Sequence, residues 1–390
     1  MKFASLLSDD ERAQLDDTLV TGVAMGFPGI SAALGNRSGL LWAGTAGYSD
    51  ILNKKPVDTD TRFGIGSITK TFVAVVVFQL VQEGKLVLDN PVTHYLEEPV
   101  VHRIPNTDTA SMRQLLNHTS GIPTWEFQPE WIPRGRGRQM VAGHIWGKTE
   151  TLDYIADGKA EAVNEPGMKY AYSNTNYTLL GLVVEAVTGN ELTAEIRRRI
   201  LEPLGMKNTF MESFEPIPGG ISHHYHYATP AFVRDAGLHP NFTEIRPYLV
   251  ESTVGNLSPE WAAGGLVSTP GDLVRFAHGL RDGALLSPAI QKEMFTFVPS
   301  ADNENREYMG GIARMPQFYD SMSILGHSGG TLGFSSIMHW FEEIDLIVTA
   351  SVNVGGMHSG LNPSPFYLYI RNVLLPAAVK CQEAMSGSKD

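Results

Sequence analysis

A serine and a lysine three positions apart, Ser67 and Lys70, have the first spacing in this 390-residue sequence that could support nucleophilic chemistry. The residues that follow predict a helix over 67–83, and residues three apart on a helix share one face, so the amine can reach the hydroxyl. The helix N-terminus would also favour negative charge on the serine oxygen. The motif alone is weak, because a serine at a helix start followed by a solvated lysine is common.

Two other polar motifs follow later in the chain. The first is Tyr172-Ser173-Asn174, just before a predicted helix. The second is His-Ser-Gly at residues 327–329, on a predicted strand that turns at Gly330. The chain therefore carries Ser-x-x-Lys, Tyr-x-Asn and a strand-borne basic residue followed by x-Gly, in that order.

A competing pattern is the nucleophile elbow Gly-x-Ser-x-Gly, which residues 326–330 match with Ser328 as the serine. In enzymes with that elbow an acid and then a histidine follow the serine, and only Asp345 with His339 or His358 could serve here. The elbow also joins a strand to a helix, whereas the residues after Ser328 predict a turn into another strand. We therefore reject the elbow interpretation.

Metal and phosphate sites are not indicated. Residues 143–149 resemble a phosphate-binding loop, but three residues rather than four separate its glycines. His223, His224 and His226 form a cluster without a third-ligand pattern, and neighbouring loop residues point in different directions. We expect no metal and no cofactor, and we interpret these histidines as exposed or packing residues.

The composition limits the partners. The formal net charge of −12 repels nucleic-acid backbones and anionic lipid, and the single Cys381 can form no internal disulfide. The N-terminus turns acidic too early for a secretory signal, and no apolar run approaches the ~20 residues of a membrane span. We expect a cytoplasmic protein with a small-molecule or short-peptide substrate and no nucleic-acid or membrane partner. The sequence leaves its oligomeric state open.

The order of the predicted elements indicates the fold class. A capping box predicts a helix over 8–26, strand-like runs cover 29–35 and 39–48, further strand-like runs follow residue 308, and a final helix covers 364–383. Strands at both ends with helices between them predict an α+β fold. Its antiparallel sheet would be built from the N- and C-terminal segments and flanked by helices, with a mainly helical domain inserted.

We expect a single catalytic unit over residues 1–390, with three parts. The pattern is largely helical from 111 to 210, whereas the segment after it has no sustained period and is rich in Pro, His and Tyr. The predicted parts are a sheet subdomain of residues 1–75 and 263–390, a helical subdomain of residues 76–210, and an irregular connection of residues 211–262.

The three motifs in this order resemble those of the serine β-lactamase and penicillin-binding-protein superfamily. The similarity is to the branch of class C β-lactamases, D-alanyl-D-alanine carboxypeptidases, D-aminopeptidases and related esterases. It extends over about residues 27–355, because four flanking segments also agree: 83–86, 88–92, 115–121 and 203–206. The resemblance implies the β-lactamase/transpeptidase-like α+β fold and an acyl-enzyme mechanism without a cofactor.

The resemblance also implies a role for each matching residue. Ser67 would be the nucleophile, and Lys70 and Tyr172 would supply its general base. Either a tyrosinate stabilised by the lysine or a neutral lysine would serve, and the sequence leaves both open. Asn174 would orient Lys70 and hydrogen-bond the substrate amide.

The strand motif would complete the site. His327, Ser328 and Gly329 would bind substrate, and the backbone N–H groups of Ser67 and Gly330 would form an oxyanion hole. β-Lactamases of this kind usually carry lysine at the position of His327, whereas a histidine with an ordinary pKa of about 6.5 is mostly neutral at pH 7. This departure favours an amidase, peptidase or esterase over a potent β-lactamase.

The sequence therefore predicts a serine hydrolase that acts on a small peptide, amide or ester, with a peptidase or amidase of the D-aminopeptidase type favoured. The alternatives are a carboxylesterase on small esters or a β-lactamase. A penicillin-recognising sensor that is acylated without turnover is an alternative of another class.

The segment between the first two motifs is rich in aromatic residues. Trp125, Trp131 and Trp146 lie there together with Phe127. They would either pack the helical part or form an aromatic lid that selects a bulky apolar group.

Overall fold

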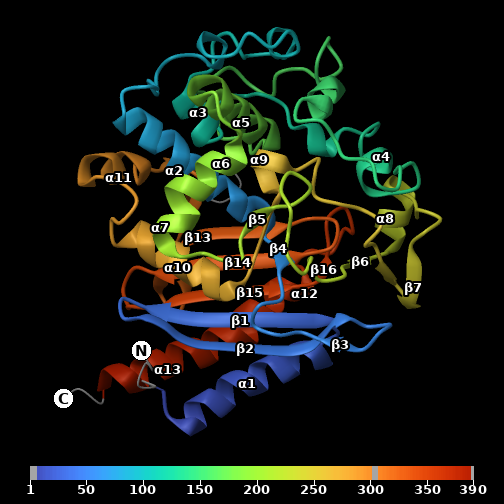
Figure 1. Ribbon diagram of the computed structural model, residues 1–390, viewed down its shortest axis with the longest axis vertical. Helices are drawn as coiled ribbons and strands as arrows, with labels where there is room; N and C mark the ends of the chain where they lie inside the picture. Colours follow the sequence, from blue (N-terminus) through green and yellow to red (C-terminus); the bar gives the residue numbers. More distant parts are fainter. Residues whose placement is uncertain (1–6, 301–305, 388–390) are drawn as a thin grey trace.

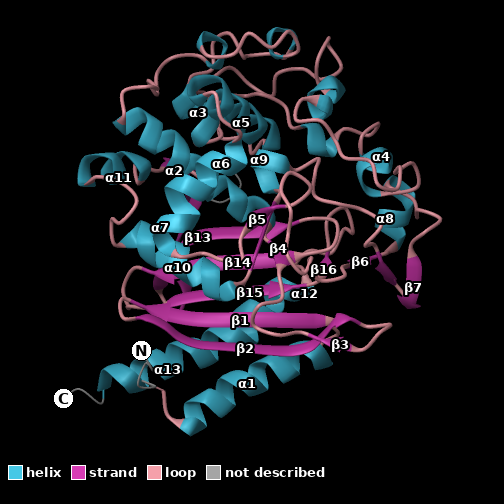
Figure 2. Ribbon diagram, in the orientation of Figure 1, coloured by secondary structure: helices cyan, strands magenta, loops and turns pink. Residues whose placement is uncertain are grey.

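A nine-stranded antiparallel sheet lies at the centre of this computed structural model, which describes residues 7–300 and 306–387 (Figures 1 and 2). Its strands come from both ends of the chain, as the sequence predicts. Their spatial order is β10 (Val298–Pro299), β11 (Glu307–Met309), β12 (Ile312–Tyr319), β13 (Met322–Gly330), β14 (Ser335–Phe341), β15 (Ile347–Val352), β1 (Gly29–Asn36), β2 (Gly39–Asp50) and β3 (Lys55–Pro56).

Helices cover both faces of the sheet (Figure 1). One face carries α1 (Asp9–Ala24), α12 (Pro365–Tyr369) and α13 (Leu375–Gly387), and the other carries α2 (Thr69–Gln82) and α10 (Pro270–Arg281). Successive residues of a strand point to opposite faces, so Val348 joins the apolar cluster under α1 while its neighbour Ile347 joins the cluster under α2 and α10. Burial on both faces explains why all eight residues of β1 are buried.

The helical part lies above the α2 face (Figure 2). It contains α3 (Met112–Leu116), α4 (Ile132–Arg136), α5 (Asn174–Thr188), α6 (Leu192–Ile196), α7 (Glu202–Leu204), α9 (Trp261–Gly264) and α11 (Pro288–Met294). The expectation of a largely helical pattern over 111–210 is confirmed from α5 to α7 but is wrong for 117–173. Loops and short helical turns dominate that segment, because prolines and glycines recur through it.

The segment 211–262 was expected to be irregular and in fact contains short elements. These are β6 (Tyr225–Tyr227), α8 (Pro230–Asp235), β7 (Thr243–Arg246) and β8 (Leu249–Glu251). β6, β7 and β8 form a small sheet with β16 (Val354–Gly355) from the C-terminal part. Strands of three or four residues are too short for a period-2 pattern to register in the sequence.

The α+β architecture is therefore as predicted, and the described part of the chain contains no helix long and apolar enough to cross a membrane. A third sheet, β4 (Phe63–Gly64), β9 (Leu266–Ser268) and β5 (Phe210–Met211), leads directly into the turn that precedes α2. That turn carries Ser67. The subdomain boundaries given above remain a prediction.

Candidate active site

Ser67 lies in a tight helical turn, Gly66–Ile68, that continues directly into α2. The turn is pressed against the end of β13 at two glycines. A Cβ on Gly66, whose φ is +51°, would lie 2.6 Å from the backbone nitrogen of Gly330, and a Cβ on Gly329 would lie 1.8 Å from the carbonyl oxygen of Ile65. Only glycine permits such close backbone approaches, so these two residues bring the serine to the strand.

Two side chains converge on the Ser67 hydroxyl. Lys70 Nζ lies 2.9 Å from Ser67 Oγ, and the Tyr172 hydroxyl donates to the same oxygen at 2.8 Å. Lys70 also donates to the carbonyl oxygen of Ala263 at 2.6 Å. The structure thus brings residues of the Ser-x-x-Lys and Tyr-x-Asn motifs together at the Ser67 hydroxyl oxygen.

The two neighbours of Ser67 differ in their protonation. Burial lowers the pKa of Lys70 to about 7, against the opposing effect of the Glu126 and Glu260 charges. Burial raises the pKa of Tyr172 well above its ordinary value, although its hydrogen bond to Ser67 opposes this. A neutral amine is therefore readily populated near pH 7 and a tyrosinate is not. Both groups lie at a similar distance from Ser67 Oγ, so of the two bases that the sequence left open only the effect of burial favours the neutral lysine.

A buried group of charges, which the sequence did not reveal, lies behind Lys70. Glu126 Oε1 is 3.6 Å from a guanidinium nitrogen of Arg136, and Arg136 also pairs with Glu260. All three residues are at most 5% exposed. Burial raises the pKa of both carboxyl groups and Arg136 opposes it. The only sign of this group in the sequence was the position of the acidic Glu126 between two aromatic residues, Trp125 and Phe127.

Asn174 contacts this charged group rather than Lys70. Its Nδ2 donates to Glu126, and the hydrogen bonds of Lys70 go to Ser67 and Ala263 instead. The expected orientation of Lys70 by Asn174 is thus indirect, through the charge of Glu126. Among the described residues, the Oδ1 atom of Asn174 is buried without a hydrogen-bond partner. Its hydrogen bond to a substrate amide remains a prediction.

The free edge of β13 forms the opposite wall. β12 pairs with β13 only as far as Gly326, whereas β14 pairs with it to Gly330. In the described part of the chain, residues 327–330 therefore have one backbone edge without a strand partner, next to the serine turn, and Ser328 is exposed. The Gly330 nitrogen lies next to the serine turn, where the sequence places one half of an oxyanion hole.

His327 is buried and neutral. Its Nε2 accepts from the Tyr308 hydroxyl at 3.0 Å, and its Nδ1 lies 2.5 Å from the carbonyl oxygen of Ser328. Burial, the nearby Lys70 and Arg306 lower the pKa of His327 to about 3, so its ring carries no charge at pH 7. This position is more firmly uncharged than an ordinary histidine would be.

His118 is a further residue of the site that the sequence did not reveal. Its ring lies 4.3 Å from the ring of Tyr172 and 4.8 Å from that of Tyr308, measured between centroids. Its Nδ1 accepts from the backbone N–H of Ser173 at 3.2 Å. Burial lowers the pKa of His118 well below its ordinary value, so a neutral ring packs against the ring of Tyr172.

The tryptophans of the aromatic segment are packing residues. Trp125 and Trp131 are fully buried and Trp146 is 8% exposed, with Trp125 and Trp131 in ring contact at 4.7 Å. Of the four aromatic residues considered for a lid, Phe127 alone is exposed, at 59%.

The histidine cluster does not converge on a common point. His223 pairs with Glu251 and Asp50, while burial lowers the pKa of His224 to about 4 and that of His226 to about 3. No group of three or more potential metal ligands occurs in residues 7–300 and 306–387.

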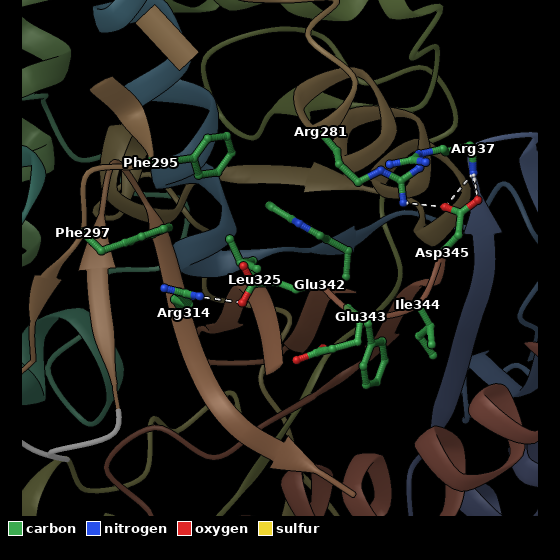
Figure 3. Close-up of a pocket in the computed structure, with 12 residues that line it drawn as sticks. Arg37, Arg281, Phe295, Phe297, Arg314, Leu325, Glu342, Glu343, Ile344 and Asp345 are labelled. Carbon is green, nitrogen blue, oxygen red and sulfur yellow. Dashed lines mark hydrogen bonds and ion pairs between the residues drawn. The ribbon is translucent and has the colours of Figure 1, made fainter. Parts of the chain in front are cut away.

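Two cavities adjoin β13. One of about 680 Å³ is lined by Leu325, Arg281 and Asp345, with Arg281 and Asp345 paired on one side of it (Figure 3). It lies toward the other end of the strand from residues 328–330 and contains none of the site residues. A cavity of about 440 Å³ is lined by residues 328–330, by Met357 and by side chains of the α12 side such as Phe366. It shares the strand end of the site, but Ser67, Lys70 and Tyr172 are not among its lining residues.

A serine in a helical turn, contacted by a buried lysine and a tyrosine beside the end of a strand, is the arrangement of a serine hydrolase. The Beta-lactamase family model matches residues 15–363, and the chain belongs to that family.

Relatives and solved structures agree with this assignment. Penicillin-binding protein 4* of Bacillus subtilis (strain 168) is 27% identical over 301 residues, which cover 77% of this chain but only 62% of that protein. The D-amino acid amidase from Ochrobactrum anthropi SV3, complexed with L-phenylalanine, is 30% identical with a TM-score of 0.80 and covers 97% of this chain and 99% of its own. A D-stereospecific amidohydrolase from Streptomyces sp. is 29% identical with a TM-score of 0.74 over 88% of this chain and 94% of its own.

Proposed function

We propose that this protein is a serine amidase or peptidase that hydrolyses a small aminoacyl amide or short peptide through an acyl-enzyme on Ser67. The observation that carries the proposal is the convergence of Lys70 and Tyr172 on the Ser67 hydroxyl, with a lysine whose pKa is lowered to about 7. A base whose pKa lies near the working pH is the efficient case for proton transfer.

The proposed reaction has two steps. Neutral Lys70 takes the Ser67 proton as the oxygen attacks the carbonyl carbon, and the N–H groups of Ser67 and Gly330 stabilise the resulting oxyanion. Collapse breaks the C–N bond, and the departing amine takes the proton from Lys70, with the Tyr172 hydroxyl as a relay. In the second step, water attacks the acyl carbon of the ester and gives a proton to Lys70. The bond between that carbon and Ser67 Oγ then breaks, the acid is released, and Lys70 returns the proton to Ser67.

Two observations favour an amide substrate without a carboxylate bound at position 327. Neutral, buried His327 supplies no positive charge where β-lactamases usually have lysine. The two solved structures described above are also a D-stereospecific amidohydrolase and a D-amino acid amidase. Within the proposed class we therefore favour D-aminoacyl amides and short peptides.

A turnover screen tests this proposal. D- and L-aminoacyl amides, short peptides, p-nitrophenyl esters and nitrocefin are offered to the wild type, to Ser67→Ala and to Ser328→Ala. We expect amide turnover and fluorophosphonate labelling that Ser67→Ala abolishes and Ser328→Ala keeps in part. An active Ser67→Ala with an inactive Ser328→Ala would instead support the elbow.

The other outcomes of the screen assign the alternatives. Ester turnover without amide turnover identifies a carboxylesterase, and preferred nitrocefin turnover identifies a β-lactamase. Stoichiometric acylation of Ser67 by a penicillin, with no turnover of any substrate, identifies a sensor.

A further inference from the structure

Two aromatic side chains, one from the helical part and one from the C-terminal part, are in contact. Phe127 ends the helical turn Trp125–Phe127, and His358 lies in the loop after β16. Their ring centroids are 5.6 Å apart with the planes at 77°, an edge-to-face contact. The two residues are far apart in sequence, so this contact joins the helical part to the sheet part.

The residues next to each ring belong to the site. On the helical side, Phe127 follows Glu126, which accepts from Asn174 and whose charge acts on Lys70. On the sheet side, His358 follows Met357, whose Cγ lies 3.6 Å from where a Cβ on Gly330 would be. The contact between the two rings therefore joins the neighbour of Glu126 to the neighbour of Met357.

Phe127 differs from its neighbours in exposure. Trp125 is fully buried and Glu126 is 5% exposed, whereas Phe127 is 59% exposed. A large aromatic ring that is exposed one residue away from Glu126 leaves apolar area that a substrate can cover. Its partner ring is uncharged at pH 7, because burial lowers the pKa of His358 to about 4.

We propose that Phe127, Met357 and His358 form a rim subsite that binds an aromatic or large aliphatic side chain on the acyl residue of the substrate. This inference rests on the amidase function proposed above and names the side-chain class of its substrate. Met357 also lines the 440 Å³ cavity together with residues 328–330, so this one member of the rim adjoins the end of β13. The rim carries no charge of its own and would exclude charged side chains by the cost of desolvating them.

The test compares two amides that differ only in side chain, phenylalaninamide and alaninamide, in the enantiomer that the wild type hydrolyses. We expect the wild type to favour phenylalaninamide, and Phe127→Ala to lower the ratio of the two kcat/KM values about tenfold, mainly through a higher KM for phenylalaninamide. Phe127→Leu keeps an apolar side chain and should retain most of the preference. Leu52→Ala, at a residue that is 60% exposed and is named in neither cavity, is the matched control and should leave the ratio unaltered.

His358→Ala tests the other half of the rim and should lower the ratio in the same direction. An unaltered ratio in both Phe127→Ala and His358→Ala would overturn the subsite. Equal losses on the two amides with a lowered Tm would overturn it too, because they would mean a purely structural role.

A failure of the amidase proposal would look different. The wild type would then hydrolyse neither amide but would hydrolyse esters. In that case the p-nitrophenyl esters of acetic and phenylpropionic acid provide the same side-chain comparison in the same variants.

Discussion

The protonation state of Lys70 decides whether Ser67 can be activated. Because burial lowers the pKa of this lysine to about 7, the neutral amine increases as the pH rises through that value. We therefore predict that kcat/KM for an uncharged amide rises through about pH 7 and then levels off. The profile is measured between about pH 5 and pH 9. A flat profile would mean that the lysine does not titrate there.

Glu126 sets that pKa in part, because its negative charge favours the lysine ammonium. Glu126→Gln removes the charge while its amide oxygen can still accept from Asn174. We predict that the rising limb of the kcat/KM profile moves to lower pH in this variant. Glu342→Gln, on the far cavity of Figure 3, is the control and should leave the limb in place. A shift to higher pH would contradict this assignment of the charge.

The sequence predicts the residues that meet at Ser67 but not the charges behind them. Ser67, Lys70 and Tyr172 lie in short motifs of recognisable spacing, and the structure finds them within hydrogen-bond distance, although their catalytic roles remain predictions. Glu126, Arg136 and Glu260 come from three separate segments, and only tertiary folding brings them together. No local period marks such a group.

At the scale of elements, the contact of β13 with the serine turn depends on glycine. A Cβ on Gly329 would lie 1.8 Å from the carbonyl oxygen of Ile65, so Gly329→Ala must push the strand away from Ser67. We predict a fall in kcat/KM of about 10²-fold, typical of a displacement near 1 Å, together with a lower Tm. Gly147→Ala is the control, because its nearest heavy atom would be 3.9 Å from the new Cβ. Equal activity in the two variants would show that the strand can move freely.

Long amphipathic helices and alternating strands were predictable because the spacing of apolar residues along each one matches the period of a helix or of a strand. The capping box of Ser8 and Glu11 starts α1 as expected, and β1 and β2 begin at the predicted residues. The loops of 117–173 and the short strands of 211–262 were not predictable, since contacts with distant segments determine them. β6, for example, pairs with β16, more than a hundred residues later in the chain.

At the scale of the whole molecule, the site lies where the sheet and the helical part meet. Ser67 belongs to the turn between them, Tyr172 and Asn174 come from the helical side, and β13 comes from the sheet. Neither part carries the full set of residues. This explains why the sequence motifs are spread over most of the chain.

The buried charges also link the stability of the molecule to its site. Arg136 is fully buried between Glu126 and Glu260, so Arg136→Met leaves two buried carboxylates without a cation. We predict a loss of about 3–5 kcal/mol in the free energy of unfolding at pH 8, measured by urea denaturation.

The sign of the pH dependence of this loss follows from the raised pKa of both carboxyl groups. The folded variant holds their protons to higher pH than the unfolded chain, so stability falls as the pH rises and the loss should be smaller at pH 5. Arg234→Met removes an exposed pairing with Asp235 and should leave stability nearly unaltered at both pH values. A loss in Arg136→Met that is equal at pH 5 and pH 8 would show that the two carboxyl groups are already protonated.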